Sequence, residues 1–275
     1  MPVEQAKISP LDRGFLFGDG IYEVIPYYFG KMVGFDAHIE RLQKGLAAIE
    51  IDLPWSKQQW RALCLQLAQK NGAQSLGLYL HITRGADTTR FHGFPKKVQP
   101  TIFAMTFSIA QPQKPDRNTR KGYALKSIED LRWQRCHIKS TALLGNVLHF
   151  QEGQKANCQE VLLYNEKQEI TEASASNIYI IKQGVVITPP LDNQILAGVT
   201  RQLFLTILRE KSTIKVEERV VTLAEAKNAD EIWISSSSKE IAPVTLLDGK
   251  PVGDGKVGEV WQQAATLYYQ HKFDY

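Results

Sequence analysis

Hydrophobic residues along the first third of the chain follow first a helical period and then an extended one. After Asp36, apolar residues recur every three or four positions, which predicts an amphipathic helix behind an aspartate cap. A second helix is expected between the capping box that starts at Ser56 and the stop signal at Gly72. Alternating apolar residues around Leu80 and the β-branched and aromatic segment Thr101–Ser108 then predict two strands.

The apolar periodicity disappears between Ile109 and Lys121, a segment that contains two prolines. We therefore place an interdomain linker at residues 113–120. It separates a small N-terminal domain, residues 1–112, from a larger C-terminal domain, residues 121–275.

The larger domain is expected to be rich in strands, with helices between them. Strands are predicted at Val161–Tyr164, Asn177–Lys182, Val185–Thr188 and Glu231–Ser235. Helices are predicted at Ser140–Lys155, from Thr200, from the capping box that starts at Thr222, and after Gly255.

Composition narrows the class of protein. With 43% apolar residues, a chain of 275 residues can bury a core. The net charge of +4 comes from scattered basic residues, not from the stripe that nucleic-acid binding needs. No apolar run approaches the roughly 18 residues of a membrane span, and residues 1–10 lack the apolar stretch of a secretion signal. The three cysteines are far apart and odd in number, which fits neither a disulfide framework nor a zinc site, so we expect a protein of the reducing cytoplasm.

Lys139 is the first candidate for chemistry. It stands between Ile138 and an apolar segment expected to start a helix, where loss of water would favour the neutral amine. A neutral lysine amine can form a Schiff base with a carbonyl compound. The alternative is an ordinary lysine whose amine reaches solvent near a helix end.

Glu172 is followed by small residues, including Ser174 and Ser176, that would let a cofactor come close. A carboxylate against the ring nitrogen of pyridoxal phosphate keeps that nitrogen protonated and makes the ring an electron sink. The alternative is a solvated glutamate in a turn.

Two segments could hold a phosphate through backbone N–H groups, at a helix start or in a loop. They are Gly198–Thr200 and the serine run Ser235–Ser238. The alternatives are an ordinary helix cap and an ordinary polar loop.

Two more segments are unusual in composition. Asp12–Val24 contains three glycines and an acid in a tight element that we expect not to be helical, and its Gly18 to Gly20 spacing lacks the rest of a dinucleotide fingerprint. Arg90 and His92, in the polar loop after the strand around Leu80, could bind a carboxylate by charge-assisted hydrogen bonds. A mobile surface loop is the alternative.

Six segments, taken together and in this order, resemble the fold-type IV pyridoxal-phosphate family. This family contains branched-chain and D-amino-acid aminotransferases and aminodeoxychorismate lyase, and the match covers nearly the whole chain. The resemblance implies an α+β fold, with a small N-terminal α/β domain, a larger C-terminal β-barrel-like domain with helices, the cofactor between them, and a homodimer. The segments are Asp12–Val24, His38–Leu42, Ile138–Ser140, Glu172–Ile178, Leu196–Arg201 and Ser236–Val244.

The resemblance also implies roles for individual residues. Lys139 would be the catalytic residue, forming the Schiff base with pyridoxal 5'-phosphate and shuttling the proton, and Glu172 would pair with the pyridine nitrogen. Leu196 would support the ring, and Tyr22 would line the substrate side. The phosphate would be surrounded by Arg41, Val199, Thr200, Ser236 and Ser237.

Within the family, Tyr22–Val24 and the pair Arg90 and His92 resemble the D-amino-acid branch, in which such an Arg and His help bind the α-carboxylate from the neighbouring subunit. The implied reaction is a ping-pong transamination from D-alanine to 2-oxoglutarate. Three departures affect substrate preference and the edge of the small domain: the loop around Arg90 is slightly longer than in the bacillary enzymes, Ala175 replaces a serine, and the chain starts later than the family pattern.

Three other functions remain open from the sequence. An L-branched-chain aminotransferase would share Lys139 and Glu172 but would be expected to lack the pair Arg90 and His92. Aminodeoxychorismate lyase would release pyruvate without a keto-acid acceptor, since sites on one fold are readily repurposed. A non-catalytic protein that has kept the scaffold is the alternative outside enzymes.

Overall fold

The computed structural model describes residues 1–72 and 74–275, which form two compact units. The first unit comprises residues 1–111 and 138–143, and the second comprises residues 112–137 and 144–275. The chain therefore returns to the first unit for one short segment, and this segment contains Lys139. The predicted division of the chain at a single linker did not anticipate this return. The linker at residues 113–120 itself stays a prediction.

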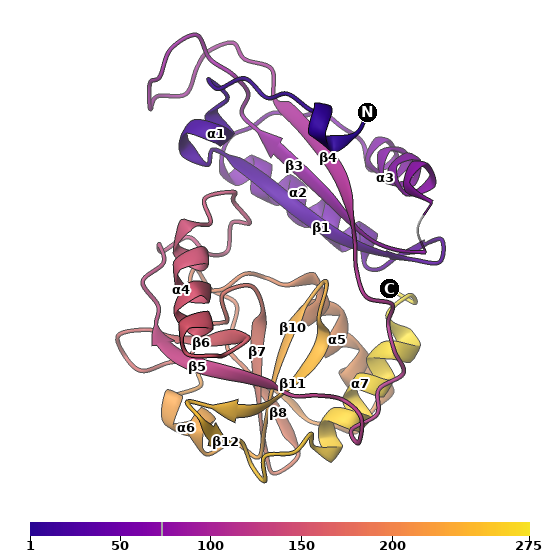
Figure 1. The fold of residues 1–275 in the computed structure, drawn as a ribbon, viewed down its shortest axis with the longest axis vertical. Helices are drawn as coiled ribbons and strands as arrows, with labels where there is room; N and C mark the ends of the chain where they lie inside the picture. Colours follow the sequence, from indigo (N-terminus) through magenta and orange to yellow (C-terminus); the bar gives the residue numbers. More distant parts are fainter. Residues whose placement is uncertain (73) are drawn as a thin grey trace. The chain divides into compact units, whose positions relative to one another are not determined.

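The first unit is an antiparallel four-stranded sheet with two helices packed on one of its faces (Figure 1). The strands lie in the order β2-β1-β3-β4. Alternate residues of β1 and β3, among them Ile21, Ile25 and Leu80, pack with apolar residues of α2 and α3 to form its core. The elements are η1 Val3–Gln5, α1 Arg13–Phe17, β1 Gly20–Tyr28, β2 Lys31–Met32, α2 Phe35–Ala48, α3 Lys57–Asn71, β3 Ser75–Thr83 and β4 Thr101–Ser108.

Local signals in this unit were predicted with mixed success. The capping box at Ser56 and the left-handed Gly72 that ends α3 are confirmed. The aspartate cap of α2 is wrong, because Gly34 caps the helix and Asp36 lies in its first turn. The expectation that Asp12–Val24 is not helical is also wrong. Asp12 accepts a hydrogen bond from the N–H of Gly14, and left-handed Gly18 ends the short helix α1.

The second unit is built on a mixed eight-stranded sheet (Figure 1). The strands lie in the order β6-β5-β11-β10-β7-β8-β9, and β12 pairs with β11. Strand β11 pairs with β10 in the antiparallel sense and with β5 in the parallel sense. The elements are β5 Tyr123–Glu129, α4 Leu144–Lys155, β6 Glu160–Tyr164, β7 Asn177–Lys182, β8 Val185–Thr188, α5 Val199–Lys211, β9 Val216–Glu218, α6 Leu223–Lys227, β10 Glu231–Ser236, β11 Glu240–Leu247, β12 Lys250–Pro251 and α7 Glu259–His271.

Both faces of this sheet are covered. On one face, Ile178 and Ile180 of β7 join Ile232 and Ile234 of β10 in an aliphatic core. On the other face, aromatic rings from the sheet meet rings from α5 and α7. These rings belong to Tyr179, Trp233, Phe204 and Tyr268.

One helix of this unit begins later than predicted, and two of its longer strands were not predicted. The helix expected from Ser140 begins at Leu144, because Ser140 forms a bridge with Ile21 of β1. Strands β5 and β11 were not predicted, since charged residues interrupt the apolar pattern of β5 and Pro243 lies within β11.

Among the residues described, the structure has no helix with the length and apolar character needed to cross a membrane.

Candidate active site

Lys139 lies in the returning segment, which backbone hydrogen bonds fasten to β1. The N–H of Tyr22 donates to the carbonyl of Lys139 (3.1 Å), and the N–H of Thr141 donates to that of Gly20 (2.9 Å). The side chain of Lys139 is half-buried, and its Nζ lies 4.1 Å from the centroid of the Tyr22 ring, within cation–π range. The structure thus brings the predicted Schiff-base lysine into contact with the tyrosine predicted to line the substrate side.

A buried cluster of Glu23, His38 and Arg41 connects β1 with α2. Because strand side chains alternate, Glu23 points to the face of the sheet opposite to Tyr22. Its Oε2 lies 2.6 Å from Nδ1 of His38, and its two oxygens accept from Nε (2.7 Å) and Nη2 (2.8 Å) of Arg41. This bidentate contact fixes the guanidinium of Arg41, whose contact with a phosphate stays a prediction.

The charges of this cluster shift the pKa values of its members. Burial alone would raise the pKa of Glu23, but the positive charge of Arg41 and the contact with His38 outweigh it and hold this pKa far below its usual range. Burial lowers the pKa of His38, with smaller contributions in the same direction from Arg41 and Lys139, while Glu23 opposes the shift. The glutamate is therefore a stable anion, and the histidine favours its neutral form.

Tyr79 and His81 of β3 lie on the same face of the sheet as Tyr22. The register pairs Tyr22 with His81, and the Tyr22 and Tyr79 rings lie 5.8 Å apart. The hydroxyl of Tyr79 and Nδ1 of His81 are 2.9 Å apart, whereas Nε2 of His81 is buried with no hydrogen-bond partner in the described part of the chain. Burial lowers the pKa of His81. Neither residue was among those predicted for the site from the sequence.

Arg90 and His92 lie in the segment between β3 and β4, and both side chains are exposed. They share a neighbour, the ring of Phe17 in α1. The Arg90 Cζ lies 5.2 Å from the centroid of this ring, and the centroid of the His92 ring lies at the same distance. The structure therefore places the two predicted carboxylate ligands beside one aromatic ring.

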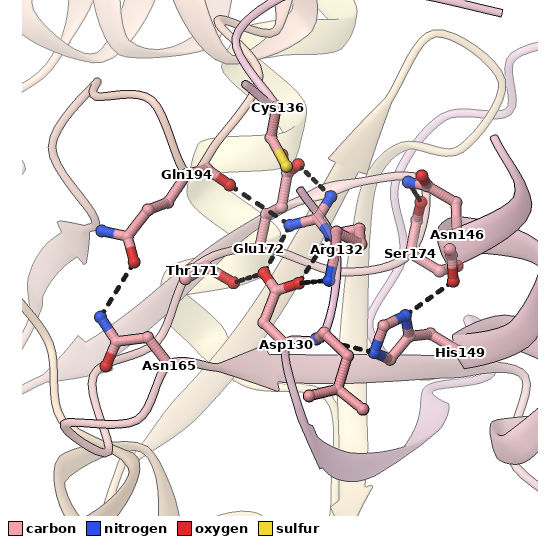
Figure 2. A network of polar contacts seen from close by, with 12 residues as sticks. Asp130, Arg132, Cys136, Asn146, His149, Asn165, Thr171, Glu172, Ser174 and Gln194 are labelled. Atoms are coloured by element: carbon pink, nitrogen blue, oxygen red, sulfur yellow. Dashed lines mark hydrogen bonds and ion pairs between the residues drawn. The ribbon is translucent and has the colours of Figure 1, made fainter. Parts of the chain in front are cut away.

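Glu172 is buried in a polar network of the second unit, shown in Figure 2. Its Oε1 accepts from Nη1 of Arg132 (2.6 Å), and its Oε2 accepts from the backbone N–H of Leu196 (3.0 Å) and from Nδ2 of Asn177 (3.3 Å). Arg132 in turn donates from Nε and Nη2 to Asp130, at 2.9 Å and 2.7 Å. Glu172, the predicted partner of the ring nitrogen, is thus hydrogen-bonded to the backbone of Leu196, the residue predicted to support the ring.

Burial and charge oppose each other in this network. Burial raises the pKa of Glu172 above its usual range, and the guanidinium of Arg132 limits this rise. Burial alone would lower the pKa of Arg132, but its hydrogen bonds to Asp130 and the negative charge of Glu172 raise it instead. Arg132 is therefore a fixed cation between two acids.

The two segments predicted to bind phosphate meet at Asn177. In the sheet register Asn177 pairs with Ser235, the last residue before Ser236 and Ser237. A Cβ on Gly198, the residue that caps α5 ahead of Val199 and Thr200, would lie 2.0 Å from Oδ1 of Asn177. Only glycine allows this approach, which brings the start of α5 next to the end of β10. Within the described residues, no side chain caps the first turn of α5.

The predicted site residues fall into two groups, one in each unit. Lys139, Tyr22, Arg41, Arg90 and His92 belong to the first unit. The second unit contains Glu172, Leu196, Val199, Thr200, Ser236 and Ser237. Arg132 was not among the residues predicted for the site from the sequence. The signal that points to it is physical, since a buried acid such as Glu172 needs a cation beside it.

Comparison with known proteins gives a consistent family. The family model described as amino-transferase class IV matches residues 20–247. The chain is 40% identical over 257 residues to a D-alanine aminotransferase of Listeria monocytogenes serotype 4b (strain F2365), covering 94% of this chain and 88% of that protein. It is 41% identical over 260 residues to a D-alanine aminotransferase of Staphylococcus aureus (strain COL), covering 94% of this chain and 90% of the other.

A solved structure shares the fold. The branched-chain amino acid aminotransferase from Escherichia coli superposes with a TM-score of 0.86 at 23% identity, covering 98% of this chain and 90% of the other. At this identity the likeness concerns the fold alone, and it confirms the predicted fold-type IV architecture. The predicted family is confirmed as well: this chain belongs to the class IV aminotransferases.

Proposed function

We propose that this protein is a pyridoxal-phosphate-dependent aminotransferase that moves the amino group of D-alanine to 2-oxoglutarate, giving pyruvate and D-glutamate. The observation that carries the proposal is the near-complete match to relatives named D-alanine aminotransferase. The sequence also contains the pair Arg90 and His92, which resembles the D-amino-acid branch of the family and agrees with those names.

The donor set of the second unit fits pyridoxal phosphate. Glu172 accepts two N–H groups at Oε2 and one at Oε1, so the carboxylate can accept a further N–H, as the protonated ring nitrogen would offer. The first turn of α5 and the adjacent serines offer N–H and hydroxyl donors of the kind that hold phosphates. When bound, the cofactor supplies an electron sink for the α-carbon of the substrate.

Residues of both units would take part in the reaction. Lys139 would bind the cofactor covalently through its amine and, when that amine is free, would take the proton from the substrate α-carbon as a general base. Glu172 would keep its negative charge against the ring nitrogen, because Arg132 stabilises the charged form. Arg90, His92 and Tyr22 would hold the α-carboxylate and so select the D-enantiomer by orientation.

A branched-chain aminotransferase is the second candidate, because solved structures of that name share this fold. The two functions predict different donors. Purified protein should accept D-alanine far better than L-leucine, in assays that combine D- and L-donors with pyruvate and 2-oxoglutarate. A preference for L-leucine would overturn the D-specific proposal. Pyruvate release from aminodeoxychorismate without any keto acid would identify a lyase instead.

Covalent attachment of the cofactor tests the role of Lys139 directly. After borohydride reduction and denaturation, the wild-type chain should retain the cofactor on the peptide that contains Lys139, and the Lys139→Ala variant should not. Lys167→Ala, a change of an exposed lysine in the second unit, is the control and should retain the cofactor. Retention by the Lys139→Ala variant would show that another amine binds it.

We also propose that the protein works as a homodimer in the cytoplasm. Its three cysteines, all in described residues, are buried free thiols, as expected in a reducing compartment. On α4, Leu144, Val147 and Leu148 are spaced so as to form one apolar stripe and are 71%, 58% and 56% exposed, which suits a surface covered by a second chain. Sedimentation at twice the chain mass would support the dimer, and sedimentation at the mass of one chain would contradict it.

A further inference from the structure

The backbone of the segment that carries Arg90 and His92 is hydrogen-bonded to one buried side chain, that of Arg13. The guanidinium of Arg13 donates to three successive carbonyls of this segment. Nη1 donates to Phe91 (2.5 Å) and to Gly93 (3.3 Å), and Nη2 donates to His92 (3.1 Å). Arg13 is only 3% exposed, although it lies in the short helix α1, far from this segment in the sequence.

Asp19 completes the support by joining Arg13 to a second arginine. Its Oδ2 accepts from Nε of Arg13 (2.8 Å) and from Nε of Arg84 (2.7 Å). Arg84 then stacks over the ring of Phe94, with its Cζ 3.6 Å from the centroid. Burial alone would raise the pKa of Asp19, but the hydrogen bonds from the two arginines outweigh it and hold this pKa below its usual range.

The geometry of these bonds constrains side-chain direction. The three carbonyls belong to consecutive residues, so the donors of Arg13 fix the path of the backbone from 91 to 93. That path determines where the side chain of His92 starts, and it also anchors Arg90, which adjoins Phe91. Both side chains are exposed, and the Phe17 ring that they share as a neighbour is itself only half-buried, so the backbone is left as the main constraint on their direction. Only an arginine has enough donors for three carbonyls and a carboxylate together.

We propose that Arg13, oriented by Asp19, is a positioning residue for binding of the substrate α-carboxylate, because it fixes the segment that presents Arg90 and His92. The proposal rests on the proposed function, in which these two residues bind that carboxylate. Arg13 itself touches neither substrate nor cofactor in this proposal. It acts through the backbone of residues 91–93.

Protease susceptibility tests the holding of the segment without any assay of activity. The segment contains three exposed trypsin sites, after Arg90, Lys96 and Lys97, whereas Arg84 is buried. In the Arg13→Lys variant, native-state cleavage at these sites should become on the order of tenfold faster, because the segment opens more often. The matched control is Arg61→Lys, since Arg61 contacts Asp36 and Phe35 instead, and its cleavage rate should equal that of wild type. Unchanged cleavage in Arg13→Lys would overturn the proposal.

Kinetics test the consequence for the carboxylate. For D-alanine and 2-oxoglutarate, Arg13→Lys should lower kcat/KM by about 10- to 100-fold, mainly through KM, because a displaced ligand binds the carboxylate poorly. The slow half-reaction with ethylamine, which has no carboxylate, should keep its wild-type rate. In an Arg90→Ala background, Arg13→Lys should add little further loss, as expected for residues that act as a unit. Equal losses for alanine and ethylamine would mean a general structural role and would overturn the proposal.

A second variant covers the case in which Arg13→Lys does not fold. Asp19→Asn keeps Arg13 but removes the charge that orients it, so it should show the same two effects at smaller size. If the wild-type protein transaminates no D-amino acid, the proposed function fails and the carboxylate role fails with it. Faster tryptic cleavage in the variants would still show that Arg13 constrains the segment. Failure of the proposed function can therefore be distinguished from failure of the proposal for Arg13.

Discussion

Arg132 and Glu172 form a buried ion pair in which Nη1 and Oε1 lie 2.6 Å apart. The side chains of the two residues are only 4% and 7% exposed. The pair matters for stability, because Arg132 compensates the buried charge of Glu172 and opposes the rise that burial causes in the pKa of this carboxylate. Asp130 accepts from Nε and Nη2 of Arg132, and Nη2 also donates to the backbone carbonyl of Gln194 (Figure 2).

Replacing Arg132 by Met should therefore destabilise the protein strongly. The change leaves Glu172 and Asp130 buried without a cation, and breaking such a pair typically costs about 3–5 kcal/mol. The free energy of unfolding in urea measures this loss. Arg117→Met is the control, because its contact with Glu259 is exposed and should contribute less than about 1 kcal/mol. A variant as stable as the control would contradict this account of the network.

Glu172→Gln should separate catalysis from folding. Glutamine keeps the size of the side chain and can still accept from Leu196, but it has no charge to hold a ring nitrogen protonated. We expect cofactor retention to remain and turnover of D-alanine to fall by on the order of 100-fold. Glu166→Gln, a change of an exposed acid nearby in the sequence, should leave turnover unchanged. Wild-type turnover in Glu172→Gln would assign the carboxylate to another task.

Local pattern was enough to select candidates. An apolar neighbour pointed to Lys139 and small following residues pointed to Glu172, and the roles of both stay predictions; the capping box at Ser56 is confirmed because it is a local interaction. The chain's return at residues 138–143 could not be found this way. A bridge between Ser140 and Ile21 is a long-range pairing, so the helical pattern that follows was extended too far toward the N-terminus.

The supporting residues were missed for a related reason. Arg13, Asp130 and Arg132 lie in segments without apolar periodicity, and their partners are distant in sequence or outside regular elements. Nothing in the pattern around Arg132 distinguishes it from Arg135, which is exposed. The difference arises only when the chain folds and Glu172 is buried, because the acid then requires a cation at hydrogen-bond distance.

The neutral His38 should make stability depend on pH below neutrality. Its folded-state pKa lies below the ordinary value of about 6.5, so the unfolded chain binds more protons as the pH falls below that value. The stabilisation is thus present above about pH 6.5 and is lost on acidification, with a slope of up to about 1.4 kcal/mol per pH unit.

The free energy of unfolding between pH 7 and pH 5 tests this dependence. His38→Gln should reduce the loss of stability over this range, whereas His137→Gln, at an exposed histidine, should leave it as in wild type. Glu172, whose pKa is raised, contributes with the opposite sign, but it does so equally in all three proteins. Equal slopes for His38→Gln and wild type would show that His38 does not change its protonation on unfolding.

Thr200→Val should weaken binding of the cofactor, and the loss should come only from the contact with its phosphate. Thr200 is buried in the first turn of α5, next to the glycine cap that Asn177 requires, and valine replaces its hydroxyl with a methyl group of similar size. A hydrogen bond to a charged group contributes about 1.5–3 kcal/mol, so the dissociation constant of pyridoxal phosphate should rise by roughly 10- to 100-fold. The affinity for pyridoxal, which lacks the phosphate, should not change. Thr206→Val, at a half-buried threonine of the same helix, controls for effects on α5 itself. Equal weakening of both ligands would place the hydroxyl of Thr200 away from the phosphate.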